Sequence, residues 1–146
     1  MDKIDREIVD LLRSDARLSF RELGEQVCLS ANTVADRVRK LVADKVLLGF
    51  GARVNLAALE LRVQAVIDVK MLPTTTAAHF EAVIRTIPGV VEALLLTGSY
   101  DYLLRVAVRD HADLERLVEA LRAKAGVQDT YSRVVLRQME VEAPLA

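Results

Sequence analysis

Hydrophobic side chains recur at helical spacing through the first 46 residues and predict three helices. The stripe of the first helix, at positions i, i+4, i+7 and i+8, consists of Ile4, Ile8, Leu11 and Leu12. The stripe of the second helix consists of Phe20, Leu23 and Val27. The stripe of the third helix consists of Val34, Val38, Leu41 and Val42. Because residues at these spacings share one helix face, each stripe is expected to face a common core.

Two capping sequences mark where the second and third helices begin. Ser19 and Glu22 form a capping box, in which the serine oxygen accepts the backbone N–H of Glu22 and the glutamate reaches back. Ser30 is a favourable N-cap for the third helix. Only residues 28–30 separate the two helices, and a connection this tight is typical of a helix-turn-helix.

The pattern changes after the third helix. Residues 46–54 are predicted to be extended, and Gly49 and Gly51 indicate a bend or a bulge. A strand or hairpin in this place is typical of a wing, so a winged helix-turn-helix is expected over residues 1–54. Residues 55–62 then form a linker with a helical turn at residues 57–59.

The rest of the chain alternates between strand and helix periods. Strands are predicted at residues 63–71, 90–97, 101–109 and 130–141. One helix, with the stripe Phe80, Val83, Ile84 and Ile87, ends at Pro88-Gly89. Another begins after Asp110 and ends at Gly126. The order β-α-β-β-α-β is ferredoxin-like. The predicted fold class is therefore α+β, with an N-terminal winged helix-turn-helix followed by a ferredoxin-like βαββαβ domain over residues 63–146.

One of these strands indicates a partner subunit. Residues 90–96 are almost continuously apolar, as in a strand covered on both faces. The helices of a ferredoxin-like domain cover only one face of the sheet. We therefore expect another subunit to bury the second face.

Composition places the chain among globular proteins. It has 146 residues, of which 52% are hydrophobic and 28% charged, which excludes intrinsic disorder. No apolar run reaches the roughly 20 residues needed to cross a bilayer, and the acidic N-terminus is unlike a secretory signal. The single cysteine, Cys28, excludes an intramolecular disulfide and suits a reducing cytosol. A cytoplasmic protein with no membrane association is expected.

Few residues are candidates for catalysis. His79 and His111 are each predicted near the start of a helix, without metal-ligand spacing to a cysteine or paired carboxylates, and are interpreted as solvated. Cys28 lies in the helix-turn-helix turn, where a small buried thiol is favoured over a nucleophile. The sequence also has no phosphate-binding glycine loop of the common spacings. We therefore expect no catalytic residues, metal or cofactor, and a protein that is not an enzyme.

The charge is balanced overall but uneven along the chain. The chain carries 20 Lys+Arg and 21 Asp+Glu, a net charge of -1, which by itself argues against a nucleic-acid partner. Residues 31–53, however, carry five basic and two acidic side chains, a local net charge of +3, whereas residues 1–60 carry 10 of each sign. The positive charge is therefore concentrated on the third helix and the predicted wing.

The outward face of the third helix carries side chains suited to DNA. Asparagine can bond adenine, a threonine methyl can contact thymine, and Arg and Lys bind guanine or phosphate. Arg37 lies about 60° from the core stripe, so a structural or phosphate role suits it better than base recognition. The alternative is a solvated charged face, but the helix-turn-helix placement favours DNA. The candidate DNA-binding residues are Ser30, Asn32, Thr33, Asp36, Arg37, Arg39, Lys40 and Arg53.

A second candidate site lies at residues 97–104, Thr-Gly-Ser-Tyr-Asp-Tyr-Leu-Leu. Gly98 would let a ligand approach backbone N–H groups, and Asp101 beside Tyr100 could bind a cationic amine or orient a neighbouring loop. Residues 126–132 supply another loop with hydroxyl groups. A simple hairpin turn with a locally hydrogen-bonded aspartate is at least as good an explanation.

Short motifs along the whole chain match one known family in its order. In the N-terminal half they are residues 5–12, 17–19, 29–30, 37–41 and 49–50. In the C-terminal half they are residues 88–90, 97–98, 100–104 and 126–127, with Thr130 and Ser132. Together these pieces resemble the Lrp/AsnC (leucine-responsive, feast/famine) family of bacterial and archaeal transcriptional regulators.

The resemblance implies a one-component regulator that binds double-stranded operator DNA and responds to a small effector, typically an amino acid. It also implies a homodimer built through the ferredoxin-like sheets, often assembled into an octamer, with the effector between dimers. The effector-binding residues that it implies are Thr97, Gly98, Tyr100, Asp101, Thr130 and Ser132. Two other classes stay open, namely an amino-acid-binding module without DNA function and a small enzyme.

Three positions depart from the family pattern. The family usually has glycine where this chain has Cys28, Lys45 and Glu60. A glycine at a helix end commonly adopts a left-handed conformation, which costs other residues roughly 1 kcal/mol or more. Either this strain is tolerated or the three turns differ.

Overall fold

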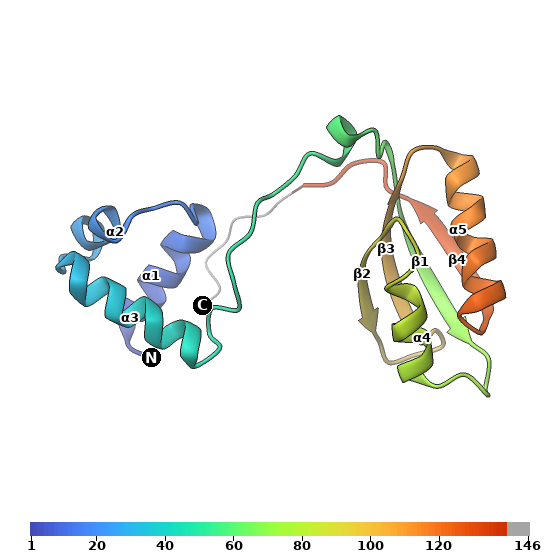
Figure 1. Cartoon of the computed structure of the whole chain (residues 1–146), viewed down its shortest axis with the longest axis horizontal. Coiled ribbons are helices and arrows are strands. Elements are labelled where there is room, and N and C mark those ends of the chain that lie inside the picture. The colour runs from blue at the N-terminus through green and yellow to red at the C-terminus, as the bar shows by residue number, and fades with distance from the viewer. Residues whose placement is uncertain (140–146) are drawn as a thin grey trace. The chain divides into compact units, whose positions relative to one another are not determined.

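The computed structural model describes residues 1–139. The chain forms two compact units, and the boundary between them along the chain falls between Arg53 and Val54. The first unit contains three helices, α1 (Lys3–Ser14), α2 (Phe20–Val27) and α3 (Ala31–Ala43) (Figure 1). Ser19 and Glu22 form the predicted capping box of α2, and Ser30 caps α3 through the backbone N–H of Thr33. Asp2 and Asp5 form a further capping box on α1.

The predicted apolar stripes meet in one core. Its buried members are Ile8, Leu12, Leu23, Val27, Val34, Val38 and Leu41. Two residues predicted to face inward do not, since Phe20 is 45% and Val42 is 44% exposed. Both lie in a terminal turn of their helix, and this small core does not extend far enough to bury them.

The turn between α2 and α3 depends on close backbone approach. A Cβ on buried Gly24 would overlap the carbonyl oxygen of Leu29, so α2 and the turn could not come together with a larger residue there. Leu29 packs against the core, and the preceding residue, Cys28, is exposed. The prediction of a buried thiol is therefore wrong, because Cys28 lies where the chain turns back and its side chain reaches solvent.

The three residues that replace the usual family glycines all adopt the left-handed conformation. Their φ angles are 56° at Cys28, 57° at Lys45 and 63° at Glu60. Cys28 follows α2, Lys45 follows α3, and Glu60 follows the short 3-10 helix η1 (Leu56–Leu59). Of the two alternatives, the chain thus keeps the turns and tolerates the strain.

The predicted wing is extended without forming a strand. Val46 and Leu47 donate their N–H groups to the carbonyl of Leu41, after which residues 48–55 have no regular secondary structure. No strand of residues 1–139 lies beside this segment to provide ladder hydrogen bonds. The linker does contain the predicted helical turn, η1, whose first N–H groups are capped by the Asn55 side chain.

The second unit has the predicted β-α-β-β-α-β order. Its elements are β1 (Val63–Met71), α4 (Ala77–Ile84), β2 (Val90–Leu95), β3 (Tyr102–Val108), α5 (His111–Lys124) and β4 (Val127–Val134). The strands form one antiparallel sheet in the order β2-β3-β1-β4. Both helices pack on one face of it and bury a core that includes Ile67, Phe80, Leu104 and Leu121 (Figure 1). The ferredoxin-like prediction is confirmed.

Several boundaries differ from the prediction. Helix α4 ends at Ile84, so Ile87 joins the core from the following turn. Strand β2 ends at Leu95. The last strand begins at Val127, because Gly126 with a φ of 65° reverses the chain at once, and it ends at Val134. Residues 140–141 of the predicted strand lie outside the described part of the chain.

The face of the sheet opposite the helices is open. Strand β2, expected to be buried on both faces, is exposed along most of its length, and its Leu94, on the open face, is 42% exposed. The same open face carries half-buried Val66 and Leu103. The single chain therefore leaves uncovered the apolar surface for which the sequence predicts a partner. No helix in residues 1–139 combines the length and the apolar character needed to cross a membrane.

Candidate DNA-binding and effector-binding sites

The outward face of α3 has the predicted composition. Asn32, Asp36, Arg39 and Lys40 are all exposed, as is Ala43 in the last turn. This face lies opposite the stripe of Val34, Val38 and Leu41, which is buried. The candidate DNA-reading side chains are thus held on a helix anchored by its other side.

The first turn of α3 is organised by hydroxyl groups. Ser30 Oγ accepts the backbone N–H of Thr33 at 3.2 Å, and the two hydroxyl oxygens lie 2.8 Å apart. Both residues are exposed. The Ser30 hydroxyl already serves as the helix cap, so its contribution to a phosphate contact would come mainly through its position at the positive end of the helix.

Arg37 makes contacts different from those of its neighbours. Its Nη1 donates to Asp2 Oδ2 at 2.8 Å and to Asp5 Oδ1 at 2.7 Å, and its side chain is only 28% exposed. Backbone N–H groups in the capping box, followed by Arg37, lower the pKa values of both carboxyl groups. Arg37 therefore joins the recognition helix to the start of α1, which favours the structural role considered for it.

The other basic candidates lie on the exposed surface. Arg39 pairs with Asp36 one turn earlier, and both side chains are 72% exposed. Such an exposed pair contributes little to stability and can exchange its carboxylate for a phosphate. Lys40 is exposed on α3, and Arg53 is exposed in the extended segment after it.

The two predicted effector segments meet at one end of the sheet. Val69 lies opposite Tyr102 on β3, and Met71 lies opposite Val127 on β4. The hairpin after β2 and the turn before β4 are therefore both adjacent to the end of β1. The Leu72 N–H further ties that end to Gly126 by donating to its carbonyl at 2.9 Å.

Asp101 is the central polar residue of this sheet end. Its Oδ2 accepts the Met71 N–H at 2.7 Å, and its Oδ1 lies 3.4 Å from Lys70 Nζ. The carboxylate, with 27% of its side chain exposed, thus orients the end of β1 and is paired with an ammonium. Of the roles considered, local hydrogen bonding is observed, and Lys70 adds a positive charge beside it.

The hairpin loop leaves backbone accessible near Asp101. Gly98 has a φ of 121°, a conformation that favours glycine, and no heavy atom of the described residues, its two chain neighbours apart, lies within 4 Å of where its Cβ would be. Thr97 is exposed and Tyr100 is half-buried. A ligand can therefore approach the loop backbone from solvent.

The hydroxyl candidates lie on the other side of the sheet from Lys70. Thr130 and Ser132 are opposite Val69 and Ile67, whose side chains face the helices, so residues 127–132 form a strand rather than the predicted loop. Thr130 Oγ1 accepts from Arg122 Nη2 of α5 at 3.3 Å. The structure thus brings the two segments together but divides their polar groups between the two faces.

Two charged residues at this end were not identified from the sequence. Lys70 lies near the end of β1, and Arg122 lies in the last turn of α5. No sequence pattern distinguishes these two residues as part of a site, because each is an ordinary solvent-facing residue of its helix or strand. Strand register places Lys70 beside Asp101, and the docking of α5 on the sheet places Arg122 beside Thr130.

A helix-turn-helix unit followed by a separate sheet unit is the organisation of a ligand-responsive DNA-binding regulator. Residues 1–42 match the AsnC-type helix-turn-helix domain, and residues 64–145 match the Lrp/AsnC ligand binding domain. The chain therefore belongs to the Lrp/AsnC family of transcriptional regulators, which are DNA-binding proteins and not enzymes.

Individual relatives agree over nearly the whole chain. The regulator AldR of Mycolicibacterium smegmatis is 35% identical over 148 residues, covering 99% of this chain and 86% of that protein. The leucine-responsive regulatory protein of Salmonella typhimurium is 29% identical over 143 residues, covering 96% and 87%. A crystal structure of a Neisseria meningitidis regulator in complex with L-methionine superimposes with a TM-score of 0.91 at 30% identity, covering 100% of this chain and 96% of that one.

Proposed function

We propose that this regulator binds an amino acid at the sheet end formed by residues 97–101 and 126–132, and that this binding changes its affinity for operator DNA. The observation that carries the proposal is the Lys70–Asp101 pair beside the open Gly98 backbone. A zwitterion offers an ammonium to the carboxylate and a carboxylate to the lysine or to loop N–H groups. The methionine complex of the Neisseria relative supports an amino acid as the ligand class.

DNA recognition is assigned to the exposed face of α3. Asn32 and Thr33 would contact bases, and Arg39, Lys40 and Arg53 would contact phosphates or guanine. Asp36 and Ser30 would adjust the position of these groups. Arg37 acts indirectly, by fixing α3 to α1 through Asp2 and Asp5.

A homodimer formed through the open sheet faces completes the proposal. This face combines apolar side chains, such as Leu103 and 57% exposed Tyr131, with two cross-strand ion pairs. Arg133 lies 2.7 Å from Asp68, and Arg105 lies 3.3 Å from Glu92. Dimers of this kind would assemble further into octamers, with the effector between dimers.

The test measures the two functions separately. Fluorescence anisotropy with DNA from upstream of the protein's own gene, with and without each common amino acid, gives DNA affinity and response. We expect Asp101→Ala to lose the amino-acid response, at least about tenfold in effective affinity, while DNA binding without effector is unchanged. Glu119→Ala, which removes an exposed carboxylate on α5, serves as the control.

Two results would contradict the proposed sites. An amino-acid response that persists unchanged in Asp101→Ala places the effector elsewhere. Failure of the intact protein to bind any upstream DNA fragment would instead count against the assignment of α3.

A further inference from the structure

A cavity of about 480 Å³ lies in the second unit, between α5, the end of β3 and the turn that follows α4. Val108 lines it and lies opposite Val63, the first residue of β1. Asp101 instead accepts the N–H of Met71, the last residue of β1. The cavity is therefore at the other end of the sheet from the residues assigned to the effector, and its volume is typical of a small-molecule site.

The lining of this cavity is mainly apolar. Ile87, Val108 and Leu117 line it and are each at most 7% exposed. Ala120 lies one turn beyond Leu117 on α5 and is half-buried, so its small side chain leaves space for a ligand. An aliphatic group that enters the cavity would be removed from water against these side chains, which is favourable.

Two arginines share one carboxylate at the border of the cavity. Arg109 donates to Asp113 from Nε at 2.6 Å and from Nη2 at 3.1 Å, and Arg116 Nη2 donates to the same carboxylate. Both guanidinium groups hold the pKa of Asp113 well below its usual range. A guanidinium has five N–H groups, and Arg116 uses one of them within residues 1–139. An adjacent pair of its N–H groups is left to bind a further carboxylate.

The same charges oppose an ammonium group. Three N–H groups of the described chain already donate to Asp113, so an ammonium would have to displace a guanidinium and lie beside two positive charges. Asp113, followed by Asp110 and Glu60, raises the pKa of Arg109. Because these three carboxylates surround Arg109, Arg116 is the cation that is open to a ligand.

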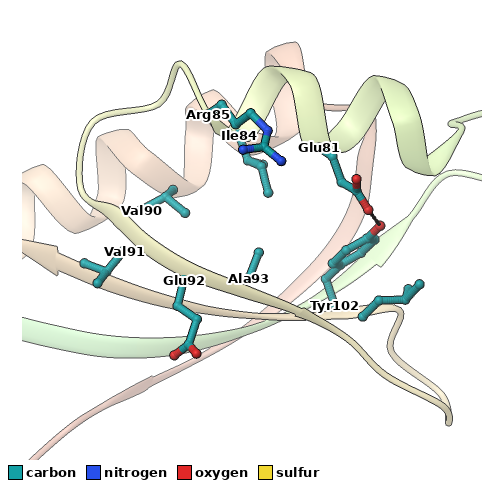
Figure 2. Close-up of a pocket in the computed structure, with 9 residues that line it drawn as sticks. Glu81, Ile84, Arg85, Val90, Val91, Glu92, Ala93 and Tyr102 are labelled. Carbon is teal, nitrogen blue, oxygen red and sulfur yellow. Dashed lines mark hydrogen bonds between the residues drawn. The ribbon is translucent and has the colours of Figure 1, made fainter. Parts of the chain in front are cut away.

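The cavity between α4 and β2 lacks this arrangement. It has a volume of about 520 Å³, and its charged lining residues are Glu81, Arg85 and Glu92 (Figure 2). Glu81 accepts the Tyr102 hydroxyl at 2.7 Å. With two carboxylates and one guanidinium, this second cavity does not attract an anion, so the charges distinguish the two cavities.

We propose that the cavity beside α5 is a second ligand site, which takes an aliphatic monocarboxylate without an ammonium group. The carboxylate pairs with Arg116, and the aliphatic part packs against Ile87, Val108 and Leu117. An amino acid offers the same two groups but adds the ammonium that the paired arginines oppose. The two ligand sites of the chain would thus distinguish an amino acid from a monocarboxylate with the same carbon skeleton.

The linker connects this site to DNA binding. Leu61 lines the cavity and donates its N–H to the carbonyl of Leu56, the first residue of η1, at 3.0 Å. This segment follows the boundary between the two units along the chain. A ligand in contact with Leu61 is therefore expected to change the affinity for upstream DNA at least about fivefold in fluorescence anisotropy.

Calorimetric titration of isocaproate into the full-length protein tests the site. Isocaproate has the carbon skeleton of leucine without its ammonium group. Arg116→Met and Ala120→Leu are each expected to weaken binding at least about tenfold, the first because a charge-assisted pair is lost and the second because the cavity is filled. Lys124→Met and Ala123→Leu, at exposed positions of α5 outside the cavity, are the matched controls and should bind like wild type.

Thermal unfolding of the same variants separates binding from folding. Asp113 keeps its two hydrogen bonds from Arg109 in Arg116→Met, and Ala120→Leu changes no charge. Both variants should therefore melt close to wild type. Absence of isocaproate binding to the intact protein, or unchanged binding in either variant, would overturn the site.

Leucine and Asp101→Ala separate this site from the proposed effector site. Leucine is expected not to compete with isocaproate, and Asp101→Ala is expected to keep isocaproate binding whatever its amino-acid response. Competition by leucine, or loss of isocaproate binding in Asp101→Ala, would place isocaproate at the effector site and overturn this inference. Unchanged DNA affinity with isocaproate bound would overturn the connection through the linker.

Discussion

The two units of the chain complete their cores in different ways. Among the described residues, the first unit encloses seven buried side chains between three capped helices, and its exposed α3 face is polar. The second unit encloses fourteen buried side chains on one side of a sheet. Within the described residues it leaves an apolar open face and two edge strands, β2 and β4, that each pair on one side.

This difference follows from the secondary structure. A helix satisfies its backbone hydrogen bonds internally and needs to bury only one stripe, so three short helices can enclose a core. A sheet has two faces and two edges, and two helices cover only one face. The helical unit therefore acts through individual side chains on its surface, whereas the sheet unit offers surfaces for ligands and further copies.

The largest expected effect tests whether the two cores are independent. Ile8 is fully buried in the smaller core, and Ile8→Ala should destabilise that unit by about 2–5 kcal/mol. Hydrogen exchange read by mass spectrometry should show lost protection in α1–α3 and unchanged protection in β1–β4. Leu104→Ala, equally buried in the second unit, should give the reverse pattern. Loss of protection in both units from either variant would show that the cores are coupled.

The next effect separates two kinds of contact on α3. Lys40→Ala should weaken binding to all DNA sequences and reduce the slope of log affinity against log salt by about 1, because one phosphate contact is lost. Asn32→Ala should cost about 1–3 kcal/mol on operator DNA alone and relax base preference at one position. Salt titrations on operator and random DNA measure both, with exposed Arg21→Ala on α2 as the control. Equal losses on both DNAs for both variants would contradict this division.

A smaller effect concerns pH and the first unit. The folded pKa values of Asp2 and Asp5 lie below 3.8, so their contribution to stability is present above that pH and is lost as the pH falls through the folded values. Arg37→Met removes a partner of both carboxylates. Its melting temperature should fall relative to wild type at neutral pH, and the difference should shrink near about pH 3.

Thermal unfolding followed by circular dichroism at the two pH values measures this difference. Arg13→Met, which removes a more exposed pair with Asp10, is the control and should show a smaller effect. A difference for Arg37→Met that stays constant with pH would mean that packing of the arginine stem, and not its ion pairs, stabilises the unit.

The smallest effect concerns the left-handed turns. Lys45 has a φ of 57° after α3, where glycine carries no Cβ penalty. Lys45→Gly should stabilise the first unit by up to about 1 kcal/mol, and Lys45→Ala, which keeps the Cβ, should give no gain. Urea denaturation of both variants measures this. A gain from alanine equal to that from glycine would attribute the effect to loss of the lysine charge.

Local signals explain why most of the fold could be predicted. Ser19, Glu22 and Ser30 start helices through hydrogen bonds within four residues, and the apolar periods of residues 63–71 and 101–109 follow from alternation alone. The errors lie where a local pattern meets a boundary. The predicted stripe of α4 includes Ile87, which lies beyond the last residue of the helix. Phe20 and Val42 belong to predicted stripes but are exposed outside the core.

The candidate sites were predictable to different degrees. The exposed face of α3 follows from helical geometry, so Asn32, Asp36, Arg39 and Lys40 lie where expected. Arg37 was separated from them by its angle to the core stripe, but its partners Asp2 and Asp5 are more than 30 residues away in sequence. No local pattern could identify those partners.

The sequence by itself determined the three helices, the ferredoxin-like order and the local positive charge, because each depends on spacing within one element. Tertiary structure alone decided that Lys70 meets Asp101, that Arg122 meets Thr130, and that Glu81 and Arg85 border the edge of β2. These contacts depend on strand register and helix docking. Register joins residues about 30 to 70 positions apart, and a single sequence carries no periodic signal over that range.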